Sequence, residues 1–168
     1  MNNTKKTALA SVLFLLALIT VAHSQNCMTF QDMGKNGVRL TQLDSLYPNA
    51  LKTETFEGVF PEGKKLKKFD KAWAGFYEEL MNYFSKSGLK WDKPTYCFNK
   101  IYFDADGNVQ YWFFNFMKED NIPADVQAKY LQGIKEFSKT HQIKIKAGTK
   151  FSQCASVTFV NADELNKK

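Results

Sequence analysis

The strongest constraint on the fold is a pair of aromatic segments joined by a short polar turn. Residues 96–103 and 109–116 are rich in Tyr, Phe and Trp, and Asp104, Asp106 and Gly107 lie between them. An Asp-Gly pair is a strong turn signal because Gly accepts the positive φ that closes a hairpin loop. We therefore predict an antiparallel hairpin across these residues.

Both faces of this hairpin carry aromatic side chains. If Asp104 closes against Asn108, Phe103 faces Val109, and strict alternation assigns every other residue to a face. Two interpretations of the more aromatic face stay open: helices cover it as core, or it is an exposed platform for a protein, peptide or glycan partner. The candidate binding residues on that face are Tyr96, Phe98, Lys100, Tyr102, Trp112, Phe114 and Phe116.

Helical periodicity flanks the hairpin on both sides. Residues 69–85 and 123–140 each place apolar side chains three or four positions apart, and four lysines between 64 and 68 are expected to form a solvated approach to the first helix. A final strand is predicted at 151–160, with weaker signals for a strand at 53–60 and a short helix at 38–46. The two apolar stripes are Trp73, Phe76, Tyr77, Leu80 and Phe84, and Val126, Tyr130, Ile134 and Phe137.

The elements follow the order helix, strand, strand, helix, strand. We predict an α+β fold in which two helices pack on a three-stranded antiparallel sheet. No repeat, low-complexity linker or second boundary interrupts residues 25–168, so we expect a single domain.

Two stretches resemble the C-terminal domain of TonB-type energy transducers. One is the run IYFDADGNV at 101–109, and the other is IKIKAG at 143–148 followed by VTF at 157–159. The resemblance implies the same element order over about 69–160 and binding by strand addition at a sheet edge. A transducer also keeps a membrane anchor and a Pro-rich spacer. This sequence has no Pro-rich stretch, so the resemblance does not extend to energy transduction.

The first 24 residues have the three parts of a cleavable signal peptide. Lysines stand at positions 5 and 6, an apolar run covers 8–22, and Ala22 and Ser24 place small residues before a cut at Gln25. An uncleaved anchor is the alternative, although the run is shorter than the about 20 apolar residues that cross a bilayer. We expect a periplasmic or secreted protein with no membrane span after cleavage.

Three cysteines remain beyond the leader: Cys27, Cys97 and Cys154. Exported proteins meet oxidising conditions, so we predict a disulfide between Cys97 and Cys154, both in expected strands. Cys27, in an N-terminal segment with few structural signals, would then be free or would link two chains. Lipid attachment to Cys27 is disfavoured because Ser, Gln and Asn precede it.

Residues typical of catalysis are sparse. A nucleophile pair could form only between a cysteine, Cys154 or Cys97, and His141, the one histidine beyond the leader. The turn at 104–108 lacks the order of a calcium loop, so no metal or other cofactor is expected. The net charge of +6 is scattered and includes only one arginine, Arg39, which disfavours nucleic acid. We expect a non-enzymatic binding module for a protein, peptide or glycan, with a small thiol-dependent hydrolase or redox protein as the alternative.

Overall fold

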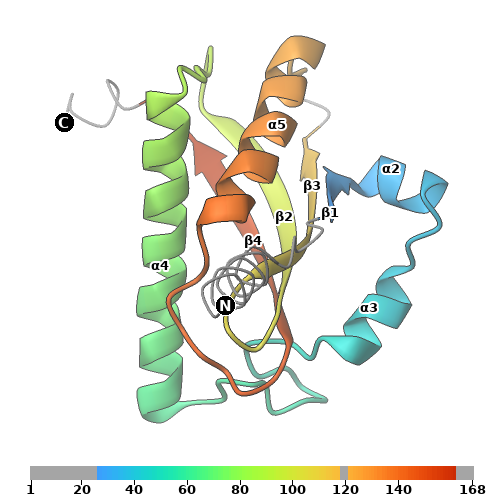
Figure 1. Cartoon of the computed structure of the whole chain (residues 1–168), viewed down its shortest axis with the longest axis vertical. Helices are drawn as coiled ribbons and strands as arrows, with labels where there is room; N and C mark the ends of the chain where they lie inside the picture. The colour runs from blue at the N-terminus through green and yellow to red at the C-terminus, as the bar shows by residue number, and fades with distance from the viewer. Residues whose placement is uncertain (1–25, 118–120, 162–168) are drawn as a thin grey trace, which may run out of the picture.

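The computed structural model describes residues 26–117 and 121–161 (Figure 1). The predicted leader, 1–24, and its cleavage site at Gln25 lie outside the described residues. Export and cleavage therefore stay predictions.

The fold is α+β, as predicted, but its sheet is larger and mixed. The sheet has four strands in the order β1-β3-β2-β4; β1 runs parallel to β3, and the other neighbours are antiparallel. The prediction of three antiparallel strands with two helices is therefore wrong in detail, since a strand at 26–29 and a helix at 30–35 were not expected, and the weak helical signal at 38–46 corresponds to a further short helix at 40–46. In chain order the elements are β1 (Asn26–Thr29), α2 (Phe30–Lys35), α3 (Leu40–Leu46), α4 (Gly63–Lys86), β2 (Thr95–Phe103), β3 (Val109–Phe116), α5 (Ala124–Thr140) and β4 (Phe151–Phe159).

The hairpin of β2 and β3 is confirmed, and its turn closes as expected. The backbone N–H of Asp104 donates to the carbonyl of Asn108 at 2.9 Å, and Gly107 has a φ of 93°. Phe103 does pair with Val109, but the next pair is Tyr102 with Tyr111. One residue of β3, Gln110, is thus extra, and this β-bulge reverses the facing of β3 relative to simple alternation.

The larger core lies between one face of the sheet and the two long helices. Figure 1 shows α4 and α5 side by side over the strands. Phe76, Leu80 and Phe84 of α4 are buried there, as the predicted stripe requires. From the sheet and α5 the same core receives Ile101, Phe103, Trp112, Phe114, Phe116, Tyr130, Ile134, Phe137, Phe151 and Phe159.

A smaller core lies on the opposite face, under α2 and α3. Tyr102 and Phe113 are fully buried there, between residues of the larger core along the same strands. Leu43 of α3 and Tyr47 beyond it cover them. The N-terminal segment therefore packs on the sheet, which the weak signals before residue 50 did not predict.

Two predicted local structures are wrong. The lysines at 64–68 belong to α4 itself, which begins at Gly63 rather than near Phe69. Residues 53–60 form no strand; instead the N–H groups of Val59 and Phe60 donate to the carbonyls of Asn49 and Ala50 at 3.0 and 2.8 Å. The apolar residues of that segment pack against α4 instead: the ring of Phe60 stacks on that of Phe69 with a centroid distance of 4.8 Å.

Asn99 organises a polar cluster inside the larger core. Its Oδ1 accepts hydrogen bonds from Trp112 Nε1 and from the hydroxyl of Tyr130, both at 2.8 Å. Its Nδ2 donates to the carbonyl of Cys97 at 3.3 Å. A buried amide is tolerated because each of these groups finds a partner.

Candidate functional site

One edge of the sheet is formed by β4. Strand β4 is the last strand of the sheet and pairs with β2 through nine consecutive residue pairs. Among the described residues, only its start has a backbone neighbour on the other side: the N–H of Ser152 donates to the carbonyl of Pro48 at 2.9 Å, and the N–H of Ala50 donates to the carbonyl of Ser152 at 2.8 Å.

The orientation of Ser152 fixes which groups of β4 face outward. Because backbone groups alternate along a strand, the N–H and C=O groups of Cys154, Ser156 and Thr158 point away from β2 as those of Ser152 do. We call these groups the outer edge of β4. The carbonyl of Cys154 accepts from the Gln153 side chain, through Nε2, at 2.9 Å, and no backbone group within 26–117 and 121–161 forms a hydrogen bond with the outer edge.

The outer edge lacks the devices that usually protect an edge strand. Natural sheets use charged side chains, Pro, bulges or short strands to prevent pairing with another chain. β4 is nine residues long, contains no charged residue, Pro or Gly, and keeps a regular register with β2. The absence of charged residues in β4 can be read from the sequence, but its position at the edge of the sheet is known only from the strand order.

Polar and aromatic side chains lie beside the outer edge on the face that carries α2 and α3. Cys154, Ser156 and Thr158 are exposed there and pair across the sheet with Lys100, Phe98 and Tyr96 respectively. The Tyr96 side chain is 38% exposed, and the Phe98 ring lies 5.7 Å from that of Phe30. This end of the face is open, whereas the end at Tyr102 is covered.

The predicted aromatic face is divided between the two sides of the sheet. Tyr96, Phe98, Lys100 and Tyr102 share one side as predicted, but the three β3 residues lie on the other. Their partners on β2 are Ile101, Asn99 and Cys97, and all three partners are buried on the side of the larger core. The bulge at Gln110 is the physical reason, and the aromatic side chains that it moves into the larger core are Trp112, Phe114 and Phe116.

Lys100 and Tyr102 are bound to α3 through one carboxylate. Lys100 Nζ lies 2.6 Å from Asp44 Oδ1, and the Tyr102 hydroxyl donates to the same oxygen at 2.8 Å. Burial raises the pKa of Tyr102, and its hydrogen bond to Asp44 raises it further. These two residues therefore hold the N-terminal segment on the sheet rather than contact solvent.

The predicted disulfide is wrong for this structure, in which all three cysteines are free thiols. Cys97 pairs with Val157, and Cys154 pairs with Lys100, so the two cysteines lie three positions apart along the ladder. At about 3.3 Å per residue this offset exceeds disulfide reach, and an odd offset puts the side chains on opposite faces. Cys97 is accordingly buried in the larger core, and Cys154 is exposed at the outer edge.

The N-terminal cysteine is also buried. Cys27 lies in β1 opposite Trp112, with its Sγ 3.7 Å from the Ser138 hydroxyl. Burial raises the pKa of Cys27 to about 11 and that of Cys97 to about 12. Burial also raises the pKa of Cys154, although Lys100 opposes the shift. None of the three environments favours the thiolate that nucleophilic chemistry needs.

His141 is placed by the end of α5. Its Nδ1 lies 2.9 Å from the Thr140 hydroxyl and 3.1 Å from the Phe137 carbonyl, and its ring stacks on Phe137 with a centroid distance of 4.2 Å. No hydrogen bond among the described residues joins it to a cysteine. The contacts that His141 does make fit a helix-terminal packing role.

The comparisons with known proteins give no relative: no family model, no curated protein and no solved structure matches the chain. Among the helices that the structure describes, none has the length and apolar character to cross a bilayer. Within the same residues, no group of three or more His, Cys, Asp or Glu side chains is arranged to hold a metal ion.

Proposed function

We propose that the chain is an exported, non-enzymatic binding module that takes an extended segment of a partner protein as an additional strand on β4. The observation that carries this proposal is the unprotected outer edge. Added strands gain affinity from backbone hydrogen bonds and selectivity from alternate side chains.

The start of β4 supports this mode of binding. Residues 48–50 already lie against Ser152 as a short parallel bridge, so a peptide would continue an edge that the chain itself has begun to cover. The resemblance of 101–109, 143–148 and 157–159 to TonB-type C-terminal domains, proposed from sequence, agrees with strand addition. Export follows from the predicted leader, and N-terminal sequencing of the secreted protein should read Gln25 first.

Selectivity would come from the open face beside the outer edge. Side chains of an added strand that point to this face would meet Cys154, Ser156 and Thr158, which are small. A long side chain could reach across them to Phe98 and Tyr96, so apolar or aromatic residues at alternate positions are favoured. A peptide partner fits this surface better than a glycan, because the unsatisfied groups are backbone donors and acceptors.

The test exploits the orientation of Ser156. Its N–H points outward, so Ser156→Pro removes one donor of the outer edge without removing a hydrogen bond to β2, whereas Ser156→Ala keeps the backbone intact. Full-length protein purified after export is used to capture partners from the cell envelope. We expect a partner retained by wild type and Ser156→Ala, with affinity for Ser156→Pro lower by about tenfold, equivalent to one hydrogen bond.

Hydrogen exchange of the captured complex supplies the geometric readout. Partner binding should slow exchange at the amides of Cys154, Ser156 and Thr158 and leave the neighbouring β2-bonded amides as they were. Equal affinity of Ser156→Pro and wild type, or protection confined to other elements, would overturn the proposal.

A further inference from the structure

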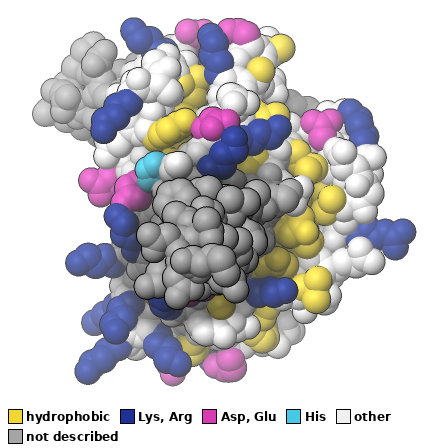
Figure 2. Space-filling view, viewed as in Figure 1, with side chains coloured by type: hydrophobic (Ala, Val, Ile, Leu, Met, Phe, Trp, Pro, Cys, Tyr) yellow, Lys and Arg dark blue, Asp and Glu magenta, His cyan; other side chains and the backbone are white. Residues whose placement is uncertain are grey.

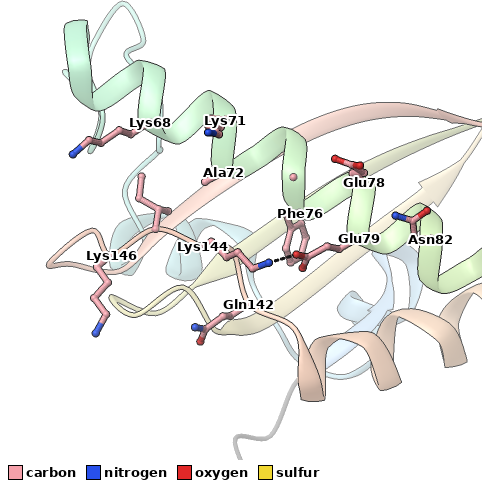
Figure 3. A pocket seen from close by; sticks show the side chains of 12 residues that line it. Lys68, Lys71, Ala72, Phe76, Glu78, Glu79, Asn82, Gln142, Lys144 and Lys146 are labelled. Atoms are coloured by element: carbon pink, nitrogen blue, oxygen red, sulfur yellow. Dashed lines mark hydrogen bonds and ion pairs between the residues drawn. The ribbon is translucent and has the colours of Figure 1, made fainter.

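A groove runs between α4 and the segment 142–146, and no residue of β4 lines it. Its volume is about 680 Å³, and the lining from α4 recurs every three or four residues, so a single side of the helix forms one wall. Figure 3 shows Lys144 of segment 142–146 extending toward Glu79 on that wall. A space of this size accommodates a small organic ligand.

The floor of the groove is apolar. Ala72, Gly75 and Phe76 form it on the helix side, and Ile145 faces them from the segment. Gly75 lies in the interior of α4, and a Cβ built on it would have no neighbour within 4 Å. The hollow therefore exists because small residues on this side of α4 leave space above Phe76.

Charge is distributed unevenly along the groove. Lys68 and Lys71 line one end, and Glu78 and Glu79 lie toward the other, as Figure 3 shows. Lys144 is paired with Glu79 across the groove. Lys68 and Lys71 form no ion pair with any described residue, so their charge is available to a ligand.

The lysines at the start of α4 are unfavourable for the helix alone. Four of them lie within the first two turns, the first turn has no acidic residue, and Glu62 makes no side-chain cap hydrogen bond. Cations in the first turn of a helix, here Lys64 and Lys65, oppose the helix dipole. Figure 2 shows dark blue side chains gathered over this end of α4. A bound anion would offset this repulsion.

We propose that the groove binds an anionic amphiphile, an elongated apolar body that ends in a carboxylate or a phosphate. The apolar body lies over Gly75, Phe76 and Ile145, and the anionic group lies between Lys68 and Lys71. This orientation keeps the anion away from Glu78 and Glu79. The site is separate from the outer edge of β4, so it adds a small-molecule ligand to the proposed function without depending on it.

Calorimetry with single-chain probes tests the proposal on the full-length exported protein. Dodecanoate and dodecyl phosphate, each below its critical micelle concentration, should bind saturably at one site. Inorganic phosphate, dodecyl maltoside and dodecyltrimethylammonium should bind at least about tenfold more weakly, since each lacks the apolar body or the negative charge. Vesicles of phosphatidylglycerol and phosphatidylcholine form a separate arm; binding to vesicles without binding to either single-chain anion would overturn the proposal.

Two pairs of variants locate the site. Gly75→Leu fills the hollow and should weaken dodecanoate binding about tenfold or more, whereas Gly75→Ala adds only one methyl group and should retain most of the affinity. Both should melt at or above the wild-type temperature, because Leu and Ala favour a helix over Gly. The double variant Lys68→Gln/Lys71→Gln should weaken dodecanoate binding, whereas Lys129→Gln/Lys139→Gln on α5, with the same change in net charge, should not.

Undiminished dodecanoate binding by folded Gly75→Leu would refute the groove as the site. Equal losses in the two double-lysine variants would show that only net charge matters, and would also refute it. Ser156→Pro should bind dodecanoate as wild type does, so that failure at the groove and failure at the outer edge are distinguishable.

Discussion

Replacing Asn99 by Ala should be among the most destabilising substitutions in the chain. The change leaves two fully buried donors without an acceptor, Trp112 Nε1 and the Tyr130 hydroxyl, both of which now donate to Asn99 at 2.8 Å. Each orphaned donor costs about 1–3 kcal/mol, so we expect the free energy of unfolding to fall by about 4 kcal/mol. For a domain of this size the melting temperature should fall by about 10 °C.

A double-mutant cycle separates the orphaned donor from the simple loss of contacts. Tyr130→Phe removes one donor while Asn99 still accepts from Trp112, so it should cost only about 1 kcal/mol. In the double variant Asn99→Ala/Tyr130→Phe one of the two orphaned donors is gone. The double variant should therefore be more stable than the sum of the single effects predicts, by about 1–2 kcal/mol.

Urea unfolding followed by tryptophan fluorescence measures all four proteins, with Asn99→Ala/Trp112→Phe as a check through the other donor. If Asn99→Ala cost less than about 1 kcal/mol, or if the single effects were simply additive, the assignment of Asn99 as the shared acceptor would be wrong.

Two further substitutions and two changes of solution conditions give four more expected outcomes. Gly107→Ala should lower the free energy of unfolding by about 3 kcal/mol, because φ is 93° and the new Cβ would lie 2.3 Å from the Ile143 carbonyl oxygen; a urea titration measures it. Gly133→Ala should destabilise although Ala favours helices, since its Cβ would lie 2.4 Å from the Phe84 ring, and the open position Gly75→Ala is the matched control in thermal melts. A disulfide reagent at pH 8 should modify one thiol in native protein, Cys154, and all three in urea. Raising the pH above about 9 should lower stability, because the unfolded state then releases thiol protons that the folded state still holds at Cys27 and Cys97.

The sequence predicts the elements whose signals are local. The hairpin, the stripes of α4 and α5 and the strand β4 each depend on residues close in the chain, and all four form where periodicity placed them. The bulge at Gln110 could not be predicted from local periodicity, because the extra residue is an ordinary strand residue and interrupts no recognisable pattern in the sequence. That single residue decides which face of the sheet Trp112, Phe114 and Phe116 occupy.

The cysteine prediction failed for a related reason. Its premise, that strands carrying Cys97 and Cys154 can be neighbours, is correct, since β2 and β4 do pair. The register, however, is set by the packing of Phe151 and Phe159 at the two ends of β4 against the larger core. Alternation along 151–159 fixes the face of Cys154, but the pairing register with β2, which fixes how far Cys154 lies from Cys97 along the strands, depends on packing against the rest of the core.

The path of the N-terminal segment explains why β4 keeps an open edge. β1 pairs with β3, so the segment begins at the opposite edge of the sheet. It then crosses the second face as α2 and α3, held by Asp44 on Lys100 and Tyr102, and reaches β4 only at Ser152. Had β1 paired with β4 instead, the outer edge would have been covered by the chain's own first strand. Because the four residues of β1 carry no strong strand pattern, this choice is made by packing, with Cys27 buried against the larger core and Met28 against the smaller one. The outer edge of β4 is therefore open because β1, a short strand with few sequence signals, pairs with β3 instead of β4.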